Sequence, residues 1–569
     1  MKTTSVVSMA AALAIGSLLV SSSRSSISAQ PQAERAAPPA HDIQVTPWGP
    51  SPELVESTKA RLDREPAVRA VLQGTRHRML SFVLLDDEDD KTQPPSRYEA
   101  TFFDYTRNRA YVVSGRFGSR RIQVARSHVQ PLPSDDEFDD AVRRLQRDPR
   151  VGPALREGRL KAFPPMPPLI NDEARVEETP RTVAVGLLPA DVSLAAADPA
   201  VSGHEIVGVN MIRSATEAFA NRAPETALVT AAACGIPNAS QSTTSRGTSG
   251  SFNVVIRRGG VELWNFVAVR PSASSGRRGS GLELRSVRYR GKSVLARAHV
   301  PILNVQYVAN QCGPYRDWQY QEGSFAADGT NVASGVRRTV TPPQTIVDNG
   351  TDTGNFRGLA FHDDGTSVFL ATEMQAGWYR YVMKWILKDD GTIQPRFAFG
   401  GVQNSCICNV HNHHAYWRFD FDVVQAGGNS VCVSEAAGQA CTDVATEKRL
   451  AAVGSHLEVR NALGTGAYRL VPGAHDGMPD PFSKATAWIL ADASNQTDDG
   501  VNCTSGRSCH TDIDIDKFMN GQSVQNRDVV VWYRGSFVHD ESGTTEGEVH
   551  PQDHDGSHTV GPDLIPVGW

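Results

Sequence analysis

Short runs in which apolar and polar residues alternate fill most of the chain beyond residue 190, and they restrict the fold more than any other feature. Alternation of this kind predicts strands with one buried face, and Gly, Asn and Asp-Gly turns separate the runs. We therefore predict a mainly β protein in which residues 191–569 form one large antiparallel β-sandwich domain. Representative runs are SFNVVIRR (251–258), VELWNFVAV (261–269) and DVVVWYRGSFVH (528–539).

Two smaller α+β units are expected before the sandwich. A helical pattern interrupted by Pro66, followed by three strand-like runs, predicts a small α+β N-terminal domain at residues 51–130. An acidic first helical turn at Ser134 then begins a second small α+β module or linker, residues 131–190, which ends in a Pro-rich stretch.

The beginning of the chain has the pattern of a secretory signal. Lys2 gives a positive start, Val6–Val20 is a short apolar run, and a Ser-rich stretch ends at Ala29 in a plausible cleavage site. We predict a signal peptide at residues 1–29 and a flexible leader at 30–50, and therefore a secreted or periplasmic protein. An uncleaved N-terminal anchor is the alternative. No later segment reaches the ~18 apolar residues that a membrane-spanning helix needs.

The charge balance and the motif content exclude several functions. The formal net charge is −6, whereas a nucleic-acid partner would require a basic surface, so no such partner is expected. The sequence contains neither a Gly-rich phosphate loop nor a nucleophile elbow. Nucleotide and serine-hydrolase chemistry therefore find no support.

Eight cysteines agree with an oxidising compartment, where they can form disulfides. The close pairs Cys432/Cys441 and Cys503/Cys509 are the expected local disulfides. The connectivity of the remaining cysteines stays open, including that of the closely spaced Cys406 and Cys408.

Two histidines of the run HNHHAYWRFDFDVV (411–424) are placed to share a metal ion. Alternate residues of a strand lie on one face, so His411 and His413 project together while His414 projects to the other face. His539, which ends a strand expected in the same sheet, is the best candidate for a third ligand. Three histidines with an open position suit copper(II) redox chemistry or catalytic zinc, and we expect copper. Three loop histidines are weaker candidates for the third ligand: His550, His554 and His558.

This part of the sequence resembles the catalytic domain of the copper amine oxidases, the topaquinone enzymes, over roughly residues 200–560. In that family an Arg and an Asp follow the His-x-His pair on one strand, as Arg418 and Asp420 do here. A late family strand begins at an Asp and ends at the third copper histidine, as the segment from Asp528 to His539 does. The resemblance implies that the three histidines named above bind copper, and that the protein is a homodimer.

The resemblance also implies a peripheral calcium site. Its carboxylates would come from Asp420, Asp422 and Asp528, and main-chain carbonyls of Phe421 and Val529 would assist them. Oxygen-rich ligation of this kind suits a hard cation. Solvated strand carboxylates are the alternative interpretation.

The segment GWYRY (377–381) resembles the family's cofactor motif and lies at the matching distance before Asp390-Gly391. The resemblance implies that Tyr379 is oxidised to topaquinone. Two positions depart from the family's pattern, because Trp378 replaces an Asn and Arg380 replaces an acidic residue. These departures put the orientation or the formation of the quinone in question, and an ordinary core tyrosine is the alternative.

The family's general base is an aspartate upstream of the quinone, and Asp317 is the residue expected here, with Glu322 as the second candidate. A carboxylate among aromatic residues is desolvated, which raises its pKa toward a range useful for proton abstraction. Pairing with a surface cation is the alternative for this aspartate. The aromatic neighbours in the sequence are Tyr315, Trp318 and Tyr320.

Together these motifs imply a primary-amine oxidase that uses copper and topaquinone. A small primary amine and molecular oxygen would be its substrates, and an aldehyde, ammonia and hydrogen peroxide its products. One alternative is a secreted metal-binding protein of the same fold whose quinone site has decayed. Another is a zinc hydrolase built on the same histidines, but no glutamate base is evident near them. The identity of the amine is left open.

Overall fold

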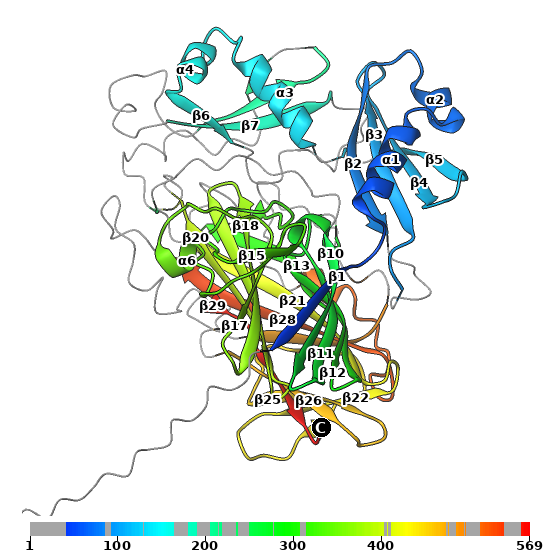
Figure 1. The fold of residues 1–569 in the computed structure, drawn as a ribbon, viewed down its shortest axis with the longest axis vertical. Helices are drawn as coiled ribbons and strands as arrows, with labels where there is room; N and C mark the ends of the chain where they lie inside the picture. The colour runs from blue at the N-terminus through cyan, green and yellow to red at the C-terminus, as the bar shows by residue number, and fades with distance from the viewer. Residues whose placement is uncertain are drawn as a thin grey trace, which may run out of the picture. The chain divides into compact units, whose positions relative to one another are not determined.

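The structure, a computed structural model, describes most of the chain beyond residue 40 (Figure 1). Every structural statement below concerns the described residues. They are 41–85, 93–128, 130–131, 133–163, 180–189, 205–213, 216–218, 235–236, 250–276, 278–307, 315–402, 407, 411–473, 476, 485–493, 496, 513–539 and 559–569.

Ten strands of the described residues form a first large sheet, in the order β1-β10-β11-β12-β13-β21-β28-β27-β24, with β14 paired to β13. Neighbours in this sheet are antiparallel. The strands are β1 (Asp42–Pro47), β10 (Ser251–Arg258), β11 (Val261–Val269), β12 (Glu283–Tyr289), β13 (Lys292–Tyr307), β14 (Tyr315–Arg316), β21 (His411–Val424), β24 (Lys448–Leu450), β27 (Thr486–Ala491) and β28 (Val529–His539).

Twelve strands of the described residues form a second large sheet, in the order β15-β16-β17-β18-β19-β20-β30-β26-β25-β22-β23, with β29 paired to β20. The pair β16–β17 is parallel. The strands are β15 (Thr330–Ala333), β16 (Val336–Arg338), β17 (Leu359–Asp363), β18 (Ser367–Ala376), β19 (Tyr379–Lys388), β20 (Ile393–Gly401), β22 (Asn429–Ser434), β23 (Thr442–Asp443), β25 (His456–Asn461), β26 (Ala467–Val471), β29 (Thr559–Val560) and β30 (Asp563–Val567). Short helices accompany the two sheets: η2 (Pro271–Ala273), α6 (Ile346–Asn349) and α7 (Ile513–Asp516).

One continuous apolar core lies between the two large sheets and takes its side chains from both. Trp385 of β19 and Trp417 of β21 meet there edge to face, with ring centroids 5.5 Å apart. Such pairs are favourable beyond the area that they bury. The runs of alternating apolar and polar residues are therefore strands that each turn one face toward the core of the sandwich.

The N-terminal part contains two smaller four-stranded sheets, each with its own helices. The first sheet, in the order β2-β3-β4-β5, accompanies two helices separated at Pro66, as the sequence predicted. Its elements are α1 (Pro52–Leu62), α2 (Pro66–Leu72), β2 (His77–Leu85), β3 (Arg97–Asp104), β4 (Arg109–Arg116) and β5 (Ile122–Ser127). The second sheet contains β6 (Leu160–Phe163), β7 (Thr182–Pro189), β8 (Glu205–Asn210) and β9 (Thr216–Ala218), with α3 (Asp135–Leu145) and α4 (Gly152–Arg156).

The helix α3 begins where its capping signal predicted, because the Ser134 hydroxyl accepts a hydrogen bond from the Glu137 main-chain N–H at 3.2 Å. Strands β8 and β9 complete the second small sheet although they lie beyond residue 190, where the sequence placed the end of this unit. The fold class is confirmed: the chain is mainly β, with large antiparallel sheets preceded by α+β units.

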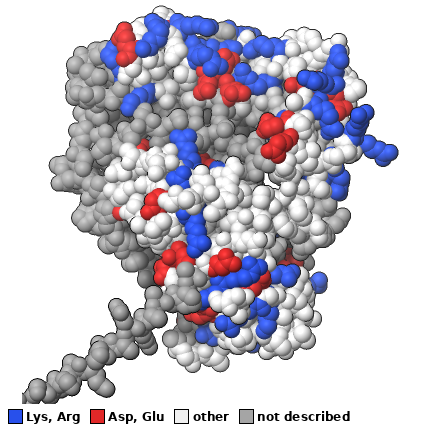
Figure 2. Space-filling model, viewed as in Figure 1, with Lys and Arg blue, Asp and Glu red and all other residues white. Residues whose placement is uncertain are grey.

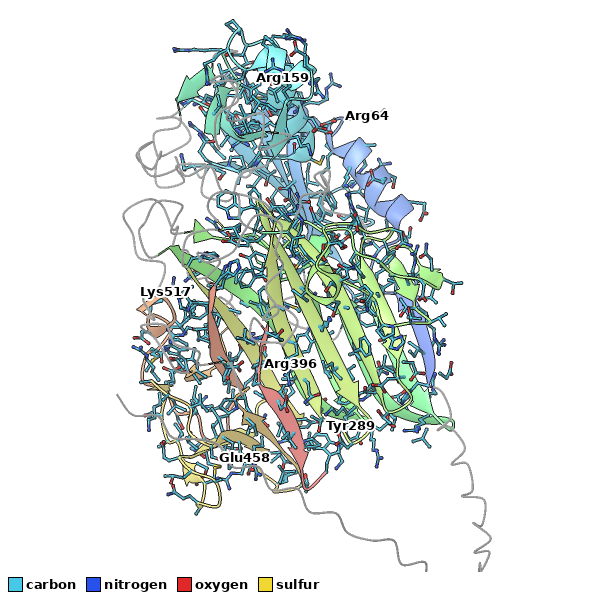
Figure 3. The ribbon with its side chains drawn as sticks, turned by 90° about the vertical axis from the view of Figure 1, so that its left-hand side faces the viewer. Arg64, Arg159, Tyr289, Arg396, Glu458 and Lys517 are labelled. Atoms are coloured by element: carbon cyan, nitrogen blue, oxygen red, sulfur yellow. A yellow bond between two sulfur atoms is a disulfide. The ribbon has the colours of Figure 1, made fainter. Side chains whose placement is uncertain are left out.

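Two further contacts join neighbouring segments of the second large sheet. The Arg396 guanidinium, labelled in Figure 3, bonds the Asp563 carboxylate at 2.5 Å and thereby attaches β30 to β20. The predicted disulfide Cys432–Cys441 is present, with its Cα atoms 5.5 Å apart. The other cysteines lie outside the described residues, including the expected pair Cys503/Cys509.

Acidic and basic side chains occur side by side on the face drawn in Figure 2. Within the described part of the chain, every helix is too short or too polar to span a bilayer.

Candidate active site

His411 and His539 lie side by side at the ends of two neighbouring strands of the first large sheet. They belong to the neighbouring antiparallel strands β21 and β28, where they are register partners, and both are buried. Nδ1 of His539 lies 3.1 Å from Nε2 of His411. Two nitrogens that each bind one ion at about 2.0–2.1 Å, at an angle of about 90–110°, lie roughly 2.8–3.4 Å apart. This pair of imidazoles therefore fits a shared metal ion.

His413 lies on the same face of β21, with its ring centroid 5.0 Å from that of His411. Its Nδ1 is 3.3 Å from the Tyr381 hydroxyl, and its ring stacks on Phe399 at 3.9 Å. Its ring nitrogens do not join those of the other two histidines in a close trio. In the described part of the chain, the one group of three ligand side chains whose ligand atoms all lie within 4.8 Å of one another consists of aspartates.

His414 projects to the opposite face, as strand periodicity predicted, and its Nδ1 is 2.8 Å from the Ser536 hydroxyl. The histidines considered as substitutes for His539 lie outside the described residues: His550, His554 and His558.

The phenol of Tyr379 reaches this histidine pair from the second sheet. Tyr379 begins β19 directly after a two-residue turn, in which Gly377 has a φ of 57°. A two-residue hairpin favours a positive φ at this position, and glycine adopts it without strain. The Tyr379 hydroxyl lies 2.6 Å from Nε2 of His411, and its ring meets that of His413 edge to face at 4.8 Å. The tyrosine is fully buried.

Asp317 adjoins the same cluster through a second tyrosine. Tyr381, which shares a strand face with Tyr379, donates its hydroxyl hydrogen to Oδ2 of Asp317. Complete burial raises the pKa of the Asp317 carboxyl to about 8, and the Tyr381 hydrogen bond and the charge of Arg278 oppose this rise only in part. Within the described chain Oδ1 of Asp317 has no hydrogen-bond partner.

The expected aromatic surroundings of Asp317 are present in part. Trp318 and Tyr320 are buried, with ring centroids 5.4 Å apart. The side chain of Tyr315 lies outside what the structure describes.

Glu322, the second candidate for the base, is held elsewhere. Its carboxylate forms a buried two-bond ion pair with Arg270, with distances of 2.9 and 2.5 Å. The structure thus brings Asp317, rather than Glu322, into contact with Tyr381 and, through it, next to His413.

The two departures from the expected cofactor motif are both accommodated by the fold. Trp378 is buried, and its carbonyl accepts a hydrogen bond from the Val402 N–H at 2.8 Å. Arg380 is also buried and forms a two-bond ion pair with Asp352, at 2.7 and 3.0 Å. The reversed charge at position 380 is therefore neutralised inside the protein.

The expected calcium carboxylates are brought together only in part. Asp420, Asp528 and Asp492 offer ligand oxygens that all lie within 4.8 Å of one another. Asp422 is outside this group, although it lies on the same strand face as Asp420. Arg418 adjoins the group and pairs with Asp420 at 3.3 Å and with Asp492 at 2.6 Å.

Phe421 and Val529, whose carbonyls were expected to assist, are register partners across β21 and β28. They therefore lie beside the aspartate group. The Phe421 carbonyl accepts a long hydrogen bond, 3.5 Å, from the Asn429 side chain.

Sequence reasoning assigned no role to three residues of these clusters. Phe399 of β20 stacks on His413 and meets His539 edge to face at 4.9 Å. Tyr381 links His413 to Asp317, and Asp492 completes the aspartate group. Only Tyr381 carried a usable signal, because it lies two residues after Tyr379 and so shares its face.

No protein-family profile matches this sequence, and no curated protein matches it. Solved structures do. A copper-containing benzylamine oxidase from Hansenula polymorpha matches with a TM-score of 0.57 at 12% identity, over 92% of this chain and 98% of its own. The Pichia pastoris lysyl oxidase gives 0.52 at 11% identity, over 92% and 90% of the two chains. An Aspergillus nidulans amine oxidase gives 0.50 at 12% identity, over 94% and 91%. The chain described here therefore has the fold of the copper-containing amine oxidases.

Proposed function

We propose that this chain is a secreted oxidase that converts a primary amine, with oxygen and water, to an aldehyde, ammonia and hydrogen peroxide. One observation carries the proposal. The Tyr379 hydroxyl lies 2.6 Å from Nε2 of His411, and Nδ1 of His539 lies 3.1 Å from the same nitrogen. A phenol held against a pair of converging imidazoles is the arrangement required for a metal ion to act on that phenol. The shared fold supports the same interpretation.

In this proposal His411, His413 and His539 hold a copper ion, and Tyr379 is the precursor of topaquinone. Imidazole nitrogens suit copper, and the separation of the His411 and His539 nitrogens fits two ligands of one ion. Copper supplies one-electron redox chemistry, and the quinone, once formed, accepts the electrons released by the amine. Burial of the histidines and of the tyrosine excludes bulk water from this chemistry.

Asp317 is proposed as the general base that removes the proton from the carbon next to the amine nitrogen. Its Oδ2 is held by the Tyr381 hydroxyl, which fixes the orientation of the carboxyl group. Oδ1 has no partner within the described chain and is available to receive a proton. Burial raises the pKa of this carboxyl group to about 8, so it acts as a base in its ionised form, whose fraction increases as the pH rises toward 8.

Three further expectations belong to the proposal. A calcium ion would bind at the aspartate group, the signal peptide would direct export, and two copies of the chain would form a homodimer. Oxygen ligands suit calcium. The residues proposed as its ligands are Asp420, Asp422, Asp528, Phe421 and Val529, with Asp492 as an additional carboxylate.

The test starts from metal-free protein, to which copper(II) is added in air. Quinone-dependent redox staining is then expected in the unaltered protein but not in Tyr379→Phe. Tyr468→Phe is the matched control, because Tyr468 is also a buried tyrosine, with its hydroxyl bonded to the Gly391 carbonyl. Peroxide release is then measured with benzylamine and with aliphatic amines. Copper bound through the histidines without staining or peroxide would refute the oxidase.

A metal-binding protein without oxidase activity is the second candidate, and one observation favours it. Trp378 and Arg380, which depart from the expected cofactor motif, lie on either side of Tyr379 and are both buried. This candidate predicts stoichiometric copper binding that is lost in His411→Ala and is unaltered in Tyr379→Phe. It also predicts no quinone under any condition.

A further inference from the structure

Arg380 makes contacts that its position in the sequence does not suggest. The inference drawn from these contacts rests on the proposed function. Tyr379 and Tyr381 project into the core, so Arg380, which lies between them on β19, projects to the other face of the strand. Its side chain is only 2% exposed. A buried guanidinium requires a counter-charge, which Asp352 provides through two hydrogen bonds at 2.7 and 3.0 Å.

The same guanidinium also holds the turn that precedes Tyr379. Its Nη1 donates to the Gly377 carbonyl and to the Tyr379 carbonyl, both at 3.1 Å. One of these carbonyls belongs to the turn and the other to the tyrosine itself. The Arg380 side chain is thus bonded to the main chain on both sides of the Cα atom that carries the phenol.

Asp352 is itself held by a short segment that crosses the second sheet. This segment, residues 345–352, contains α6 and is called the α6 segment below. Its Ile346 N–H donates to the Glu373 carboxylate of β18 at 2.8 Å, and its Asp348 pairs with Lys384 of β19 at 2.6 Å. Ile346 also lies close against Gly400 of β20, where an added Cβ atom would come within 3.0–3.1 Å of it. The α6 segment is therefore attached to three neighbouring strands.

We propose that Arg380 and Asp352 are positioning residues that hold the Tyr379 hydroxyl against His411. The α6 segment fixes Asp352, Asp352 fixes the guanidinium, and the guanidinium fixes the carbonyls on either side of the tyrosine. Arginine suits this role because its planar group can bond a carboxylate and main-chain carbonyls at the same time. The acidic residue expected at position 380 could not donate these bonds.

The first test uses metal-free protein and does not depend on the cofactor. Amide hydrogen exchange of residues 376–381 is measured in Arg380→Met and in Asp352→Asn. We expect exchange at this turn to accelerate at least tenfold in both variants. The control is Arg396→Met, which removes an ion pair with Asp563 between β20 and β30, outside the α6 segment, and should leave the turn unchanged. Unchanged exchange in Arg380→Met would overturn the inference.

The second test asks whether the pair acts by charge and geometry. The double variant Arg380→Met/Asp352→Asn removes both buried charges, so it remains informative if a single variant does not fold. The exchanged pair Arg380→Asp/Asp352→Arg restores the ion pair without the bonds to Gly377 and Tyr379. Both variants should show the rapid turn exchange of Arg380→Met. Slow amide exchange at the turn in either double variant would show that Arg380 acts only as a counter-charge, and would refute the positioning role.

The third test connects the pair to the cofactor. In protein that binds copper normally, quinone formation should be at least tenfold slower in Arg380→Met than in Arg396→Met. An equal rate in the two variants would overturn the positioning role. If the unaltered protein forms no quinone, the proposed function fails, while the exchange measurements still decide whether Arg380 and Asp352 hold the turn.

Discussion

Replacement of Asp317 by Asn should make the sandwich more stable at neutral and alkaline pH. The Asp317 carboxyl has a pKa of about 8 in the folded protein because it is completely buried, against an ordinary value of 3.8. Below about pH 4 it is protonated in both the folded and the unfolded chain and costs nothing. Between these two pKa values the unfolded chain releases the proton while the folded chain keeps it. The stability of the folded state therefore falls as the pH rises.

The expected magnitude follows from the separation of the two pKa values. Each pH unit between them lowers the free energy of unfolding by about 1.4 kcal/mol, so the cumulative cost at pH 7 is of the order of 4 kcal/mol. The cost levels off above about pH 8. Asn cannot ionise and avoids this cost, although its N–H group, placed where Oδ1 lies without a partner, would offset about 1–3 kcal/mol.

Urea unfolding of metal-free protein, followed by tryptophan fluorescence from pH 4.5 to pH 9, measures this difference. The difference in unfolding free energy between Asp317→Asn and the unaltered protein should grow steadily up to about pH 8. Glu435→Gln is the control, because Glu435 is exposed and should give a nearly constant difference. A constant difference for Asp317→Asn as well would mean that this carboxyl titrates like a surface group. Asp317 would then not hold a proton next to Tyr381 at neutral pH.

Three other variants test separate parts of the description. His539→Ala should lower copper affinity at least about 100-fold in a chelator competition titration, because it removes a metal ligand and not merely a residue that hydrogen-bonds to a ligand. An unchanged affinity would exclude His539 from the site. Glu322→Gln should lower the unfolding free energy by about 3–5 kcal/mol, since it removes the charge of the carboxylate that pairs with Arg270, yet it should leave the pH dependence due to Asp317 intact. Asp492→Asn should reduce the rise in melting temperature caused by calcium, and an equal rise in both proteins would place calcium elsewhere.

The histidine pair could be predicted from the sequence because strand periodicity determines which residues share a face. His411, His413 and His414 were assigned to faces by counting, and His539 followed from its position at the end of a strand with a recognisable beginning. The position of each ring nitrogen could not be predicted in this way. It depends on side-chain packing, and the stacking of Phe399 on His413 comes from a strand whose sequence gave no indication of that contact.

Other contacts depend on which strands become neighbours, and a local pattern does not contain that information. Asp492 directly follows β27, and its approach to Asp420 requires β27 and β21 to lie on either side of β28. The sequence favoured Asp317 over Glu322, but the contacts that distinguish these two residues depend on distant strands for the same reason. The two residues are close in sequence, but one adjoins Tyr381 and the other pairs with Arg270 from a distant segment.

The phenols and the imidazoles of the candidate site come from opposite sheets, and this origin has a consequence for how damage to the protein would be detected. A change of about 1 Å in the spacing between the sheets would lengthen the 2.6 Å contact between the Tyr379 hydroxyl and His411 beyond hydrogen-bond range. Under the proposed function, core substitutions far from the histidines should therefore slow cofactor formation by more than their effect on the melting temperature alone would suggest. The chemistry of the site would then report on the packing of the whole sandwich more sensitively than its stability does.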